Sequence, residues 1–251
     1  MDMLGPRAQA GCATLRWAEP GAMLALALLA LAASRYSDLD LWLTQVFFDP
    51  VTRRFPWREQ WFAAGVLHDG ARWVSAFAAL ALLGPLLVGT WAPNERWRAL
   101  RGPAAFTLLA ALLSAWLVAA LKHRSAHSCP WDLSLFGGGF DYFRLLGTPP
   151  ANPGPGHCLP SGHASTGFMW IGAFYAARRW PAAAPWARVK GWAPAWALFA
   201  TSSALAQLVR GAHFLSHLLL AIALCWAVAW ALDRTWHALR AAAQAVFSPA
   251  A

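Results

Sequence analysis

Long apolar stretches separated by short polar segments are the main pattern of this chain. Five of them contain no Asp, Glu, Lys or Arg over about the length that crosses roughly 30 Å of hydrocarbon as an α-helix. A shorter run, Pro20–Ser34, reaches that length if Trp17 and Tyr36 are its interfacial ends. The pattern predicts an all-α polytopic membrane protein, a bundle of six transmembrane helices. Their approximate bounds are 18–36, 73–92, 102–121, 162–178, 191–210 and 214–232.

The first apolar run has an alternative interpretation as a signal peptide. Arg7 and Arg16 precede its apolar core, and Leu31–Ser34 resembles a small-residue cleavage site. Cleavage there would leave five helices and would place the polar loops less naturally on one side of the membrane. We therefore expect this run to be the first helix.

Composition supports a membrane protein. Apolar residues make up 59% of the 251 residues, and charged residues only 12%, against roughly 25% in soluble domains. The 17 Trp residues suit the two rims of a bilayer, where indole rings concentrate. The bilayer is therefore an expected partner of this chain.

The distribution of charge predicts the orientation of the helices. With the N-terminus inside, the cytoplasmic segments carry eleven basic and four acidic residues, and the outer segments carry nine basic and seven acidic ones. This is the positive-inside pattern, and it places both termini in the cytoplasm. The net charge of +9 then reflects topology and an anion site, and no nucleic-acid partner is expected. We expect a bacterial inner membrane, with the outer segments in the periplasm.

Two long external loops belong to the single membrane-embedded domain expected over residues 1–251. The loop at 37–70 interleaves aromatic and basic residues, as a segment lying in the membrane interface does. It is either a connector with Trp anchors or a lid facing the substrate. The loop at 122–160 is rich in Pro and Gly, which exclude a regular helix. Loops of this length are more often functional than not.

Histidines at the mouths of apolar runs are the main candidates for chemistry. His163 follows Pro160-Ser161-Gly162, and His213 and His217 lie close together after Gly211. Each group adjoins a glycine-containing turn whose backbone N–H groups are free to bind an anion. Two histidines from separate membrane helices, with Lys122 at the end of a third, are typical of a phosphate-transfer site at a membrane surface.

These residues resemble the signature segments of the type 2 phosphatidic acid phosphatase (PAP2) superfamily. The family pattern is Lys-x6-Arg-Pro, then Pro-Ser-Gly-His, then Ser-Arg-x5-His-x3-Asp. Here the segments are Lys122 with Cys129-Pro130, Pro160–His163, and His213 with His217. The resemblance implies a six-helix phosphatase or phosphotransferase that acts on a lipid phosphate or diphosphate without a cofactor or metal. It leaves open which lipid phosphate is the substrate.

The resemblance also implies a role for each matching residue. His213 would be the nucleophile that forms a phosphohistidine, and His163 would be the general acid and base. The phosphoryl oxygens would be bound by Lys122, the Ser161 hydroxyl and the Gly162 N–H.

Three positions depart from the family pattern. Cys129 and Gln207 replace arginines, and His217 replaces the aspartate that orients the nucleophile. We expect Arg124 and Arg210 to replace the lost guanidinium groups. Arg124 lies two residues after Lys122, and Arg210 shares a helix face with Gln207, since residues three or four apart do so. A neutral His217 can accept a hydrogen bond from His213, although it stabilises an imidazolium less than a carboxylate does.

The cysteines add one structural expectation. Cys129 and Cys158 both lie in the second external loop, so in an oxidising compartment we expect them to form a disulfide that links the first signature segment to the second. The alternative is two unrelated thiols.

Two other functions remain open. One is a zinc-dependent membrane hydrolase, although the sequence lacks the Glu of a metalloprotease helix. The other is a transporter or a scaffold that binds lipid phosphates without turnover. The candidate zinc ligands are His123, His127, Cys129, His157, Cys158 and His163.

Overall fold

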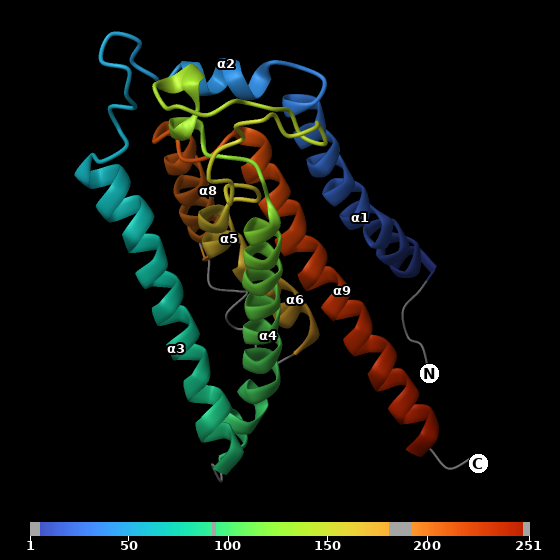
Figure 1. Ribbon diagram of the computed structural model, residues 1–251. Helices are drawn as coiled ribbons and strands as arrows, with labels where there is room; N and C mark the ends of the chain where they lie inside the picture. The colour runs from blue at the N-terminus through green and yellow to red at the C-terminus, as the bar shows by residue number, and fades with distance from the viewer. Residues whose placement is uncertain (1–5, 92–93, 181–191, 248–251) are drawn as a thin grey trace.

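The molecule is an all-helical bundle (Figure 1). The computed structural model describes residues 6–91, 94–180 and 192–247, and those ranges contain no β-strand. The helices run roughly side by side, and the long loops gather at one end, around α2 (Leu39–Gln45). The turn between α3 (Gly70–Trp91) and α4 (Glu95–Arg124) lies at the other end.

The first helix, α1, spans Pro6–Ser34, so it begins well before the predicted residue 18 and ends slightly before residue 36. Its end is fixed by the second external loop. Arg144 Nη1 donates to the Ser34 carbonyl at 3.1 Å, and the Leu145 N–H donates to Ser34 Oγ at 3.1 Å. Beyond this point the chain bends by 74° into α2, which lies across the end of the bundle (Figure 1).

The segment predicted as a loop at 37–70 is partly helical. Besides α2, it contains a π-helical stretch, Phe62–Asp69, that continues directly into α3. Gln60 starts this stretch, because its Oε1 accepts the N–H groups of Phe62 and Ala63 at 2.8 and 3.0 Å. The polar residues before position 73 therefore lie on the first turns of a long helix, and they do not end it.

Charged residues extend α4 in the same way. It starts at the N-cap Asn94, whose Oδ1 accepts the Arg96 N–H at 2.8 Å, and it ends at Arg124, so it exceeds the predicted 102–121 at both ends. Lys122 consequently lies in the last turn of a helix. The predicted loop at 122–160 begins only after Arg124, and it also contains two short 3₁₀ turns, Pro130–Asp132 and Ser134–Phe136.

The helix predicted at 162–178 is broken. It consists of α5 (Gly162–Phe168), a 3₁₀ turn (Met169–Ile171) and α6 (Gly172–Arg179). Side chains of neighbouring helices occupy carbonyls just before the break. Ser75 Oγ donates to the Thr166 carbonyl at 2.8 Å, and Trp196 Nε1 donates to the Gly167 carbonyl at 3.1 Å. Packing against α3 and α8 thus competes with the regular helical hydrogen bonds.

The last two helices are α8 (Trp192–Val209) and α9 (Leu215–Phe247). α8 agrees with the predicted 191–210, whereas α9 continues well beyond the predicted residue 232. Asp233 does not stop α9, because this buried carboxylate forms an ion pair with Arg179 of α6. The predicted cytoplasmic connection that carries Arg188 and Lys190 lies outside the described residues, as do positions 92 and 191.

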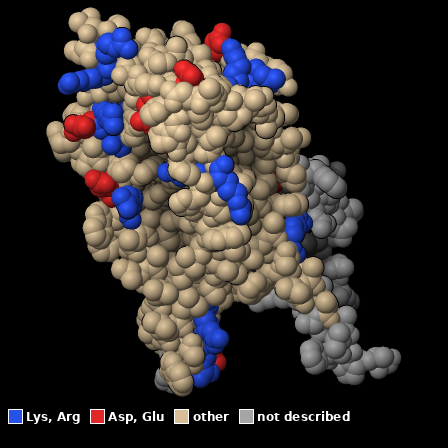
Figure 2. Space-filling view, in the orientation of Figure 1, with Lys and Arg blue, Asp and Glu red and all other residues tan. Residues whose placement is uncertain are grey.

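Three helical stretches in the described ranges are long and apolar enough to cross a membrane: Phe62–Trp91, Glu95–Arg124 and Leu215–Leu239. The bent pair of Glu19–Ser34 and Leu39–Gln45 would make a fourth span. Length and hydropathy therefore support a membrane protein with three or four such spans, and they do not establish the predicted six. On the face in Figure 2, charged side chains gather over the loop end, and a smaller group lies at the α3–α4 turn.

Candidate active site

Three segments that are distant in sequence meet at the loop end of the bundle. They are the last turn of α4 with Lys122, the turn that starts α5, and the connection from α8 to α9 with His213. The Ser161 N–H donates to the His217 carbonyl at 3.1 Å, which joins the second segment to the third. A Cβ placed on Gly162 would lie 3.8 Å from Lys122 Nζ, so the ammonium group lies beside this turn.

Ser161 is the N-cap of α5. Its side chain is fully buried, and its Oγ accepts the Ala164 N–H at 3.2 Å. The oxygen therefore already accepts one hydrogen bond, and its hydroxyl hydrogen can donate to an anion at this turn.

His163 lies in the first turn of α5, two residues after Ser161, and stacks on a residue that the sequence analysis did not single out. Its ring centroid is 3.8 Å from that of His68, with 27° between the ring planes. His68 Nδ1 in turn lies 2.9 Å from Asp69 Oδ1. The sequence does contain a clue, because His68 and Asp69 directly precede an apolar helix, much as His163 begins one.

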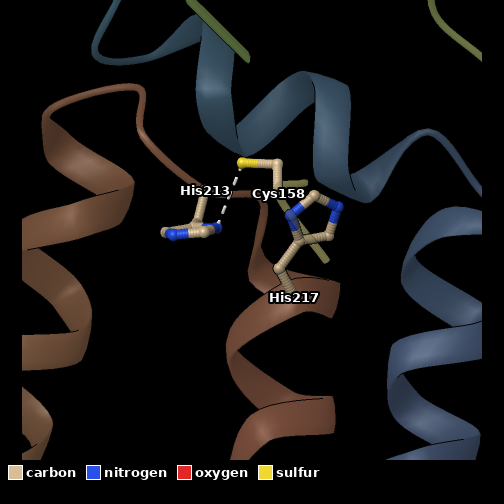
Figure 3. A group of neighbouring side chains, drawn as sticks. All are labelled: Cys158, His213 and His217. Carbon is tan, nitrogen blue, oxygen red and sulfur yellow. Dashed lines mark hydrogen bonds between the residues drawn. The ribbon is translucent and has the colours of Figure 1, made fainter. Parts of the chain in front are cut away.

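His213 is buried in the turn between α8 and α9, with 3% of its surface exposed. Its backbone N–H donates to the Gln207 carbonyl at 3.2 Å. Its ring Nδ1 lies 3.3 Å from Cys158 Sγ, and Figure 3 shows the other ring nitrogen on the far side from Cys158 and His217. Gly211 allows this turn because its φ of 68° lies in the left-handed region that favours glycine. The Phe55 ring also leaves no room for a side chain at this position.

His217 does not hydrogen-bond to His213 as expected. The two ring centroids are 5.8 Å apart with 68° between the planes, and the buried His217 Nδ1 has no hydrogen-bond partner in the described part of the chain. The contact at His213 Nδ1 is therefore made by the disulfide sulfur of Cys158. On its other side, His217 approaches His127, with 6.2 Å between ring centroids.

Of the two arginines expected to replace the lost guanidinium groups, Arg210 lies in the site region. It is 8% exposed, its Nη1 donates to Gln207 Oε1 at 3.3 Å, and its Nε donates to the Arg58 carbonyl at 2.9 Å. The guanidinium group of Arg210 thus lies beside Gln207, the residue at the position of the family's arginine. Arg124 is exposed at the end of α4, and its side chain makes no hydrogen bond or ion pair within the described residues.

Cys129 and Cys158 form the expected disulfide, with 2.03 Å between sulfurs and 5.2 Å between Cα atoms. The bond links the loop after α4 to the turn before α5.

The disulfide argues against the zinc alternative. In the described ranges, Cys158, His213 and His217 form a group of potential metal ligands (Figure 3). A sulfur held in a disulfide has no thiolate to offer, so this group does not fit a zinc site while the bond is intact.

The electrostatics of the site keep the His213 ring neutral. Burial lowers the pKa of His213 well below 6.5, and the neighbouring His217, Lys122 and His163 lower it further. Burial also lowers the pKa of His127, behind His217, to about 4. A neutral imidazole retains the lone pair that attack on phosphorus requires.

Comparison with known proteins gives one match. The model of the PAP2 superfamily matches residues 103–241, just over half of the chain, and this range contains every signature segment described above. No curated protein and no solved structure matches the chain significantly.

Proposed function

The chain belongs to the PAP2 superfamily, whose members are in general phosphatase-type enzymes, and on that premise we propose that it removes a phosphoryl group from a lipid phosphate or diphosphate. The observation that carries the proposal is the meeting of Lys122, His163 and His213. They come from three separate segments, and the charges of Lys122 and His163 act on His213. Transfer of a phosphoryl group to water needs a cation to bind its oxygens, an acid for the leaving oxygen and a nucleophile.

In the proposed reaction, the ring nitrogen of His213 remote from Cys158 attacks phosphorus in line with the leaving oxygen. A P–N bond forms as the P–O bond to the lipid breaks, and His163 gives its proton to the leaving oxygen. Water then attacks the phosphohistidine, the P–N bond breaks, and His163 recovers a proton from that water. The phosphoryl oxygens are held by Lys122, Arg210, and the Ser161 hydroxyl with the Gly162 N–H. Arg124 stays a candidate for a further contact.

A lipid substrate suits the surroundings of this site. Exposed aromatic residues Trp57, Trp61 and Trp73 lie in the chain just before and after His68. Indole rings favour the level of lipid headgroups, where a lipid phosphate would lie. In our proposal the chain crosses a bacterial inner membrane six times within one domain, and the site faces the periplasm. The positive-inside distribution of charge supports that orientation.

The test is an assay of the purified, detergent-solubilised protein on phosphatidic acid, phosphatidylglycerol phosphate, an isoprenyl diphosphate and lipid A phosphate, each with and without chelator. Release of phosphate from at least one of them, unaffected by chelator, is the expected result. Loss of activity on chelation would favour a metal-dependent hydrolase instead. Absence of turnover on the whole panel would favour a scaffold or transporter.

A further inference from the structure

His68 and Asp69 lie beside the proposed acid–base residue but outside the part of the chain that the family model matches. The His68 ring covers one face of His163, with 3.8 Å between centroids. About a fifth of the His68 side chain is exposed, whereas Asp69 is mostly exposed. The pair therefore connects the partly buried ring of His163 to a carboxylate at the surface.

The local backbone is unusual at the same place. Phe62–Asp69 is π-helical, and its final hydrogen bond runs from the Gly70 N–H to the Gly65 carbonyl. π-Helical turns are rare, and they often occur at functional sites. The wider turn changes the direction in which residues at its end project, and here that end carries His68 against His163.

The charges around His163 suggest what the contact with His68 does. To protonate a leaving oxygen, His163 must itself be protonated, but burial disfavours its charged form, and the groups that act on it are cationic or neutral. They are His68, Arg72, Lys122, Arg210 and His213. Asp69 is a carboxylate that acts on both His68 and Arg210. Its negative charge can offset the positive charge of these neighbouring groups.

The geometry points to His68, held by Asp69, as a positioning residue for His163 in the proposed phosphoryl transfer. Stacking fixes the ring plane of His163. The two stacked imidazoles can carry at most one proton between them, since two cations 3.8 Å apart would repel strongly. The Asp69 carboxylate favours binding of that proton, because it lies within hydrogen-bond distance of His68 and attracts its positive charge. This inference rests on the proposed function, because it requires His163 to act as an acid.

The proposed reaction neither gains nor loses a proton at His163 over a full cycle. His163 gives one proton to the leaving oxygen when the P–O bond breaks, and it regains one from the water that cleaves the phosphohistidine. No additional reactant is needed, and His68 only sets the orientation of His163 and the pH at which it is charged.

The experiment uses the full-length protein with the variants Asp69→Asn, His68→Phe and His68→Ala. Glu59→Gln, an exposed carboxylate in the same segment, and His123→Phe, an exposed histidine at the end of α4, are the matched controls. Each protein is assayed across pH on a lipid alkyl phosphate and on an activated aryl phosphate, whose leaving group needs no proton.

For Asp69→Asn we expect kcat on the alkyl phosphate to fall by about tenfold or more with little change in KM, and kcat on the aryl phosphate to stay within about threefold. Loss of the carboxylate lowers the pKa of the stacked pair, so the alkaline limb of kcat should move to lower pH. His68→Phe should show the same selectivity, and His68→Ala, which also removes the stack, should lose more than His68→Phe.

Equal losses on both substrates, or an unmoved alkaline limb, would show a merely structural role and overturn the inference. Wild-type levels in all three variants would overturn it too, while the proposed function would stand. If the wild-type protein turns over neither substrate, the proposed function fails, and this inference fails with it.

Discussion

At the scale of single residues, the proposed nucleophile His213 is surrounded differently from the family pattern. No carboxylate hydrogen-bonds to His213 within the described part of the chain, and its Nδ1 faces the sulfur of Cys158. A carboxylate would stabilise the imidazolium form, whereas sulfur and the neutral His217 do so less. The result is a neutral His213, and in the proposed reaction the surrounding cations bind the phosphoryl group.

Arg210 is the first such cation to test. Arg210→Gln should reduce kcat/KM by about 10²- to 10³-fold, the loss of about 2.7–4 kcal/mol seen when one oxyanion donor is removed. Adding Gln207→Arg should recover part of that loss, because Gln207 and Arg210 already share a hydrogen bond in this space. Arg124→Gln should cost less, since Arg124 is exposed. A silent Arg210→Gln would leave phosphate binding to Lys122 and the Ser161–Gly162 turn.

The sequence located His163, His213 and Lys122 because their spacing follows a family pattern. It did not locate His68, since the stack on His163 depends on a π-helical turn that no spacing rule indicates. It also assigned His217 a direct hydrogen bond to His213. Spacing of four residues predicts one side of a helix, but His213 lies before α9, in a turn, so the two rings project differently.

At the scale of the elements, helix packing sets the position of the site. α5 carries His163 and lies so close to α8 that a Cβ on Gly167 would be 2.6 Å from the Ala200 Cα. The apolar pattern predicted a helix at 162–178, but it could not predict the break after Phe168. That break arises from hydrogen bonds donated by side chains of other helices.

Gly167→Ala should therefore move α5 and lower the stability of the protein by about 1–3 kcal/mol. Activity should fall as well, because His163 moves with the helix. Gly84→Ala is the control, since nothing lies within 4 Å of its added Cβ and alanine favours the helix. Thermal unfolding in detergent measures both variants. Equal midpoints for the two would contradict this account of the α5–α8 contact.

The disulfide has a comparable role in the second external loop. Its cysteines are 29 residues apart, so its loss should cost about 3.5 kcal/mol by the chain-entropy relation. Cys129→Ser tests this with Cys158 left beside His213, whereas Cys158→Ser also removes the sulfur at Nδ1. We expect similar losses of stability, measured by unfolding, and a larger loss of activity for Cys158→Ser. Unchanged stability in both would refute the structural role of the bond.

At the scale of the whole molecule, an apolar surface separates two polar ends. Large side chains of α3 and α4 are exposed, among them Phe77, Leu80, Leu87 and Trp116. Contiguous apolar surface of this kind suits hydrocarbon. The apolar runs predicted this arrangement directly. They could not predict that α9 continues past Asp233, because the ion pair with Arg179 joins residues remote in sequence.

The predicted orientation can be tested with single cysteines. In a protein that carries Cys12→Ser and Cys225→Ser and keeps the disulfide, Arg96→Cys and Arg124→Cys place one exposed thiol at either end of α4. A membrane-impermeant maleimide added to intact bacterial spheroplasts should label the cysteine at 124 and leave the one at 96 unlabelled. Labelling only at position 96 would reverse the orientation and move the site to the cytoplasmic side.

The most direct test of the central proposal is phosphoryl labelling of the enzyme. Wild-type protein quenched during turnover of a ³²P-labelled lipid phosphate should carry an acid-labile label at His213. His213→Ala should fold normally, lose turnover and carry no label, while His123→Ala, which changes an exposed histidine, should retain both. Full turnover by His213→Ala, or a label that persists in that variant, would contradict the proposal that His213 is the nucleophile.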